Sequence, residues 1–142
     1  MNPSNTLDHA ERQALEEALD DEYKSHATYA QVIRDFGPQR PFINIVEAEA
    51  RHVSALLGLF DKYAIVAPAN RWAGNVPRYA TLAVACIASV QGEIDNVALY
   101  DRVLGSTGRA DILDVFHALR AASQDRHLPA FQRCAARGRG LE

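Results

Sequence analysis

Apolar residues recur at helical spacing over four long segments of this 142-residue chain, and no alternating strand pattern competes with them. The segments run from about 7 to 36, 41 to 63, 78 to 104 and 109 to 137. Glycine directly follows the first, third and fourth segments, at Gly37, Gly105 and Gly138, while Pro41 begins the second segment and Pro77 directly precedes the third. The pattern therefore predicts an all-α fold of four helices in a single domain.

The lengths of the connections predict how these helices are arranged. The first and last connections are only a few residues long, so each joins an antiparallel helical hairpin. The middle connection, about residues 64–77, is 14 residues long. Fully extended it reaches roughly 46 Å, whereas a helix of about 22 residues is only roughly 33 Å long. It can therefore return along the bundle, so that the third helix runs parallel to the second.

Polar residues of the same kinds occur twice on the predicted core faces. Each half has a Glu-x6-Tyr pair and then an acid or amide three residues before a histidine: Glu22, Tyr29, Glu49 and His52, then Glu93, Tyr100, Gln124 and His127. A carboxylate on a core face is costly unless it is paired, protonated or bound to a cation. Residues three apart share a helix face, so Glu49 can bridge two metals while His52 binds one. The pattern predicts a dinuclear metal centre whose ligands are Glu22, Glu49, His52, Glu93 and His127.

The second half departs from the first at Gln124, which stands where Glu49 stands. A neutral amide cannot bridge two metals as a carboxylate does, so one metal position is expected to be weaker. His26 lies one turn after Glu22 and is a candidate for an additional nitrogen ligand, or else a hydrogen-bonded core histidine. If the helix faces are assigned the other way, Glu47 and Asp125 become the ligands.

Two further features lie beside the predicted ligands. Tyr29 and Tyr100 follow Glu22 and Glu93 by two turns and are expected either around the metals or half-buried with their hydroxyls at the rim. Pro129 removes a backbone donor inside the fourth segment, which predicts a kink beside His127.

Composition limits the classes of partner. Hydrophobic residues make up 48% and charged residues 23% of the chain, and the net charge is −3. With no basic block, nucleic acid is not an expected partner. No run of about 18 apolar residues is present, so no membrane partner is expected. The first six residues lack the basic and apolar regions of a secretion signal, which predicts a cytoplasmic protein.

Cys86 and Cys134 are the chain's two cysteines, and they are far apart in sequence. Without a Cys-x-x-Cys pair, a zinc ribbon or a rubredoxin-type iron centre is excluded. On antiparallel helices both lie on the same side of the predicted site. The cytoplasmic expectation favours two reduced core thiols, and a redox-active pair is the alternative.

The chain resembles ferritin-like proteins, notably rubrerythrin and bacterioferritin bundles, and most closely a ferritin-like domain family of prokaryotes. The likeness covers nearly the whole chain and is carried by residues 21–29, 42–52 and 122–131. It implies a ferritin-like four-helix bundle, two iron ions per chain, and association through helix faces that favours a homodimer. Manganese and zinc also accept imidazole and carboxylate ligands.

Three functions are candidates, the first two from the metal ligands and the third from Gln124. The first is an enzyme in which reduced metals react with oxygen or hydrogen peroxide, as ferroxidases and rubrerythrin-like peroxidases do, with electrons from Fe(II) or a separate donor. The second is metal sequestration without turnover. The third is a structural or interaction bundle without metal, in which the buried acids pair with His26, His52 and His127.

Overall fold

The computed structural model describes residues 6–138, and within them every regular element is helical. The elements are α1 (His9–Phe36), α2 (Phe42–Lys62), α3 (Leu82–Val103), a short 3-10 turn (Leu104–Ser106), α4 (Ala110–Ala122), a π-helical turn (Ser123–His127) and α5 (Leu128–Ala136). The last three form one continuous rod, so the fold has four helical rods and no strand in the described part. The predicted all-α class is confirmed.

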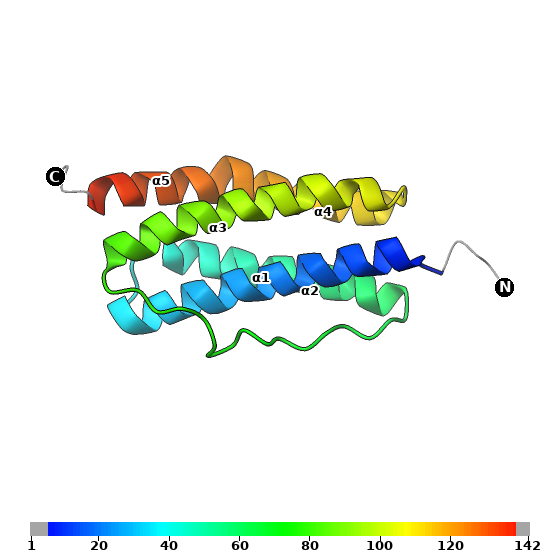
Figure 1. The fold of residues 1–142 in the computed structure, drawn as a ribbon, viewed down its shortest axis with the longest axis horizontal. Coiled ribbons are helices and arrows are strands. Elements are labelled where there is room, and N and C mark those ends of the chain that lie inside the picture. Colours follow the sequence, from blue (N-terminus) through cyan, green and yellow to red (C-terminus); the bar gives the residue numbers. More distant parts are fainter. Residues whose placement is uncertain (1–5, 139–142) are drawn as a thin grey trace.

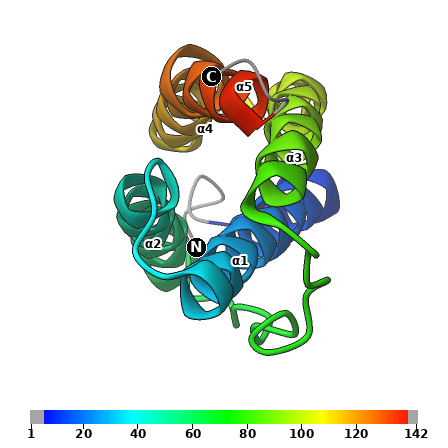
Figure 2. The same cartoon turned by 90° about the vertical axis from the view of Figure 1, so that its left-hand side faces the viewer.

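The rods form two antiparallel pairs. Figure 1 shows α1 antiparallel to α2, and α3 antiparallel to the rod of α4 and α5. Between the pairs, the chain runs back along the outside of the bundle, so that α3 starts near the end at which α2 starts. Seen from the end, the four rods surround a common axis (Figure 2). These positions allow every rod to present one face to the same interior.

The crossover, residues 63–81, is fastened to α1 by two arginines. Arg71 donates to both carboxylate oxygens of Asp20 at 2.8 and 2.9 Å, and the Trp72 indole donates to the same carboxylate at 3.1 Å. Arg78 donates to both oxygens of Asp35. Helix α3 begins four residues later than the pattern predicts because the Thr81 side chain accepts the backbone N–H of Val84 and caps the helix there.

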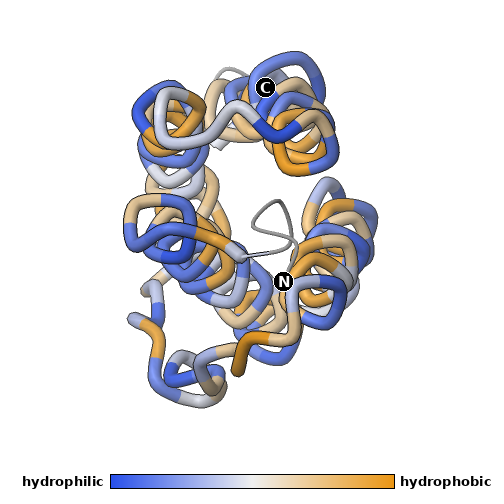
Figure 3. Tube along the Cα trace, turned by 90° about the vertical axis from the view of Figure 1, so that its right-hand side faces the viewer, coloured by the Kyte–Doolittle hydropathy of each residue, from blue (hydrophilic) through white to orange (hydrophobic). Residues whose placement is uncertain are grey.

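The buried interior consists of two apolar clusters with a polar layer between them. Hydrophobic positions recur along every rod (Figure 3). One cluster includes Leu15, Leu19, Leu56, Phe60, Tyr100 and Phe116. The other includes Tyr29, Val32, Phe42, Ile45, Cys86 and Phe131. The glutamates and histidines singled out by their spacing lie between these clusters in sequence on each rod, so apolar packing on both sides keeps that layer away from water.

The fourth rod changes its winding beside His127. In the π-helical turn the backbone N–H of Leu128 donates to the carbonyl of Ser123, five residues earlier. Pro129 follows directly at the start of α5. Its ring would clash with the carbonyl four residues before it in an α-helix, and the wider turn relieves that clash. The irregularity predicted from Pro129 is therefore a π turn.

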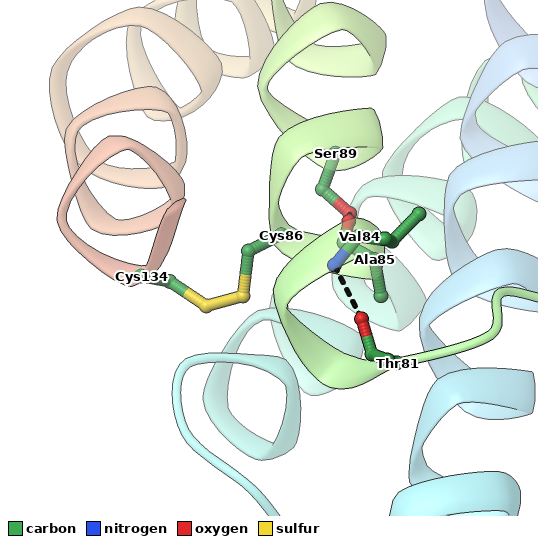
Figure 4. The surroundings of a disulfide bond; sticks show 6 residues. All are labelled: Thr81, Val84, Ala85, Cys86, Ser89 and Cys134. Carbon is green, nitrogen blue, oxygen red and sulfur yellow. Dashed lines mark hydrogen bonds between the residues drawn. A yellow bond between two sulfur atoms is a disulfide. The ribbon is translucent and has the colours of Figure 1, made fainter. Parts of the chain in front are cut away.

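Cys86 of α3 and Cys134 of α5 form a disulfide, and their Cα atoms are 5.7 Å apart (Figure 4). The sequence favoured two reduced thiols, and this expectation is wrong for the structure described here. Ala85 and Ala135, which directly flank the two cysteines, are buried in the same cluster, and the Cα separation is within the range of natural disulfides. The disulfide therefore ties the second hairpin together near its open end.

We predict that reducing this disulfide destabilises the fold markedly. It spans a sequence separation of 48 residues. A cross-link of that span lowers the entropy of the unfolded chain enough to be worth about 4 kcal/mol. Thermal unfolding of the wild type should fall on the order of 10 °C when a reductant is added. The Cys86→Ser/Cys134→Ser variant should melt at the lower temperature with or without reductant. Equal melting of oxidised and reduced wild type would contradict the prediction.

One helical stretch, Leu82–Ser106, is long and apolar enough to cross a membrane, judged by length and composition alone. The core helix of a helical bundle can meet the same criteria. Here the stretch packs in the bundle and carries the buried Glu93 and Asn96 on its inner face. Its outer face exposes Val84, Ile87 and Ile94.

Candidate metal centre

The five predicted ligands converge from all four rods into the polar layer. They form two groups whose ligand atoms lie within 4.8 Å of one another: Glu22, Glu49 and His52 in one, and Glu49, Glu93 and His127 in the other. Glu49 belongs to both groups. The three glutamates are 0–1% exposed. Each group could hold one metal ion, with Glu49 between the two ions.

The histidines connect the carboxylates into one chain of contacts. His52 Nδ1 lies 2.9 Å from Glu22 Oε1 and 3.6 Å from Glu49 Oε2. His127 Nδ1 lies 3.0 Å from Glu49 Oε1 and 3.2 Å from Glu93 Oε1. The two imidazole rings are stacked, with centroids 5.6 Å apart. Glu49 is thus flanked by a histidine on each side, and each histidine also contacts a second glutamate.

The two tyrosines cross between the halves. Tyr29 of α1 donates to Glu93 of α3, and Tyr100 of α3 donates to Glu22 of α1, the latter at 2.9 Å. Both are buried, and burial raises the pKa of each hydroxyl well above its usual value. They therefore stay protonated and donate. The two Glu-x6-Tyr pairs are therefore linked crosswise. The tyrosine of each pair donates to the glutamate of the other pair.

Three residues at the site were not anticipated from the sequence. Asn96 Nδ2 donates to Glu22 at 2.9 Å and to Asp21 at 2.7 Å, and Ser123 Oγ donates to Asn96 Oδ1 at 2.7 Å. The signal was present for Asn96, which is three residues after Glu93 and therefore on the same helix face. Ser123 was hidden by the π turn. Asp21 adds a fourth acid beside the first group, and burial raises its pKa to about 6.

Burial and hydrogen bonding shift the pKa values of Glu22 and Glu49 in opposite directions. Burial raises the pKa of Glu22 to about 7, and the charge of neighbouring Glu49 acts in the same direction. Burial alone would raise the pKa of Glu49 too, but His127 and His52 outweigh it and lower that pKa. Burial would lower the pKa of both histidines, but Glu22 and Glu49 raise that of His52 to about 10, and Glu49 and Glu93 raise that of His127 to about 9. Without metal, the histidinium ions supply the positive charge that this layer needs.

We predict that the metal-free protein loses stability as the pH rises above neutrality. A histidine whose pKa is higher in the folded state than its unfolded value of about 6.5 stabilises the fold fully below that value. This contribution is lost as the pH rises through about 9 for His127 and about 10 for His52. Urea unfolding at pH 6.5 and pH 9.5 should therefore differ on the order of a few kcal/mol. The exposed His117 provides the control: His117→Gln should keep this pH dependence, and His52→Gln should reduce it. A flat wild-type profile would contradict the assignment.

The remaining candidates lie outside the two groups. Gln124 is exposed. The π turn places Ser123, and not Gln124, on the buried face beside His127. His26 is half-buried, and burial lowers its pKa. Glu47 and Asp125 are exposed, so the alternative assignment of the helix faces is wrong. The second half of the site therefore has no counterpart of Glu49, and the single Glu49 is shared.

The fold has a counterpart among solved structures. The crystal structure of hypothetical protein MJ0754 from Methanococcus jannaschii DSM 2661 matches with a TM-score of 0.82 and 21% sequence identity. The match covers 92% of this chain and 82% of that chain. At this identity the likeness concerns the fold alone. A scan against protein-family models and a search of curated proteins found no match.

Proposed function

We propose that this chain is a ferritin-like protein that binds two iron ions and oxidises them with oxygen or hydrogen peroxide. The observation that carries the proposal is the position of Glu49, which is buried between two histidine-carboxylate groups and belongs to both. A carboxylate shared in this way is the bridging ligand of the dinuclear sites found in four-helix bundles.

The donor set fits such a pair of metals. Each group offers two carboxylates and one imidazole, a combination that suits iron, manganese and zinc. Three carboxylates face the four positive charges of two divalent ions, and Asn96 donates to both Asp21 and Glu22, which places a fourth acid beside the first group. The additional acid beside Glu22 favours the first group, so the position at Glu93 and His127 is the weaker one.

The chain's own residues prepare the layer for this role. Tyr29, Tyr100 and Asn96 hold oxygens of Glu93 and Glu22 by hydrogen bonds, which orients the remaining oxygens. The apolar clusters pack against this layer at both ends and limit its contact with water there. Bound iron, when reduced, supplies the electrons for reduction of the oxidant. Turnover beyond the first oxidation needs fresh Fe(II) or a separate electron donor.

The test is anaerobic loading with Fe(II), followed by rapid mixing with oxygen or hydrogen peroxide and recording of absorbance and oxidant consumption. The proposal expects oxidation much faster than that of Fe(II) in buffer, and no acceleration in Glu49→Gln. If iron is bound but oxidised no faster than in buffer, the protein sequesters metal without turnover.

A metal-free structural bundle is the competing function, and one observation favours it. Every buried side-chain nitrogen and oxygen in the described residues has a hydrogen-bond partner. The histidines and glutamates thus satisfy one another without an ion. Under this alternative the purified protein takes up no Fe(II), Mn(II) or Zn(II), and these ions leave its unfolding temperature unchanged.

A further inference from the structure

A groove between α2 and the rod of α4 and α5 is lined by arginines. It has a volume of about 480 Å³, and the arginines along it are Arg40, Arg51, Arg126, Arg133 and Arg137. Among the residues that the structure describes, no carboxylate lines it. The chain as a whole has a net charge of −3. The groove is therefore positively charged in a protein whose net charge is negative.

In the described part of the chain, five arginines elsewhere in the bundle are paired with carboxylates, whereas the five groove arginines are not. Arg71, Arg78, Arg102, Arg109 and Arg120 each form an ion pair with an aspartate or glutamate. None of the five groove arginines forms an ion pair or side-chain hydrogen bond with another described residue. Arg133 and Arg137 are four residues apart, a spacing at which like charges on one helix face repel. An anion in the groove would offset this repulsion.

The inner end of the groove reaches the metal centre. His127 lines the groove, is 4% exposed, and lies 3.0 Å from Glu49 and 3.2 Å from Glu93. The groove therefore leads from the surface arginines to the histidine of the second group. Its volume lies within the roughly 300–1,000 Å³ typical of sites for small molecules.

We propose that this groove binds a small molecule carrying two or more carboxylate or phosphate groups, with one end beside His127. The guanidinium group is suited to this chemistry because its planar donors bind carboxylate or phosphate oxygens in pairs. That the bound molecule lies beside metal ions rests on the function proposed above. That it binds to the arginines does not depend on that function. This face would then serve a polyanionic substrate or effector of the metal centre.

The test is calorimetric titration of the metal-free protein at low ionic strength with citrate and, separately, with pyrophosphate, which distinguishes a carboxylate ligand from a phosphate ligand. The inference expects one site per chain with a dissociation constant below roughly 1 mM for at least one of them. Arg51→Gln/Arg126→Gln should weaken binding roughly tenfold or more. The matched control, Arg71→Gln/Arg102→Gln, removes the same number of charges elsewhere and should bind nearly as the wild type does.

Three results would overturn the inference: no binding of either anion, equal weakening in the two double variants, or tighter binding of a single-stranded oligonucleotide than of both small anions. The last would identify a surface for a polymer, with its steep salt dependence. Circular dichroism and Fe(II) uptake of both variants show whether the fold and metal centre are intact. Anion binding without Fe(II) uptake would reject the proposed function and leave this inference standing.

Discussion

Replacing Glu49 with glutamine is expected to remove both metals at once, from about two per chain to nearly none. Glu49 is the carboxylate common to both groups, and it lies between His52 and His127. Glutamine has the same size but no charge, and it cannot bridge two ions. The loss of one negative charge therefore affects two ions, which no other single ligand substitution does. The measurement is elemental analysis after anaerobic Fe(II) loading and gel filtration.

Glu47→Gln is the matched control for this experiment. It makes the same chemical change on the same helix two residues earlier, where the side chain is exposed. It should retain the wild-type metal content. Retention of both metals by Glu49→Gln, or equal loss in the two variants, would show that Glu49 does not bridge.

Removing one half of the site is expected to leave a protein with about one metal per chain. Glu93→Gln/His127→Gln removes two ligands of the second group and leaves Glu22, Glu49 and His52 in place. Glu22→Gln/His52→Gln does the converse. Because Asp21 is linked to Glu22 through Asn96 and its charge interacts more strongly with Glu22 than with Glu93, the variant that keeps the first group should hold its ion more tightly. Competition with a chelator measures this difference.

The paired design also separates loss of ligands from loss of fold. Truncating one member of a buried ion pair leaves an uncompensated charge, which typically costs about 3–5 kcal/mol. Each double variant removes a carboxylate together with its histidine, so the charges leave in pairs. Loss of both metals from both variants, with helical content unchanged, would contradict two separable positions.

The convergence of the five candidate ligands could be predicted because residues three or four apart in a helix lie on the same face. Glu49 and His52 are three apart and lie together, as an α-helix requires. The crosswise pairing of Tyr29 and Tyr100 could not be predicted, because it depends on how far α1 and α3 are staggered. Sequence spacing within one helix contains no information about that stagger.

The failure at Gln124 has a local cause. A regular helix would place Gln124 beside His127, but the π turn ahead of Pro129 places Ser123 there. The presence of Pro129 predicted that the helix is irregular here. It did not predict a π turn, and the π turn is what buries Ser123 in place of Gln124. The disulfide was missed for a different reason: the expectation of reduced thiols came from an inferred compartment, and the spacing of Cys86 and Cys134 already placed them on the same side of the site.

The central claim is that two metals lie in the buried polar layer and share Glu49. Anomalous diffraction from crystals of the Fe(II)-loaded or Mn(II)-loaded protein tests it most directly. The account predicts two anomalous peaks roughly 3.5–4 Å apart, one between Glu22 and His52, the other between Glu93 and His127, with Glu49 contacting both. A layer without peaks, with Glu49 still between the two histidines, would contradict it and identify a bundle whose buried acids and histidines neutralise one another.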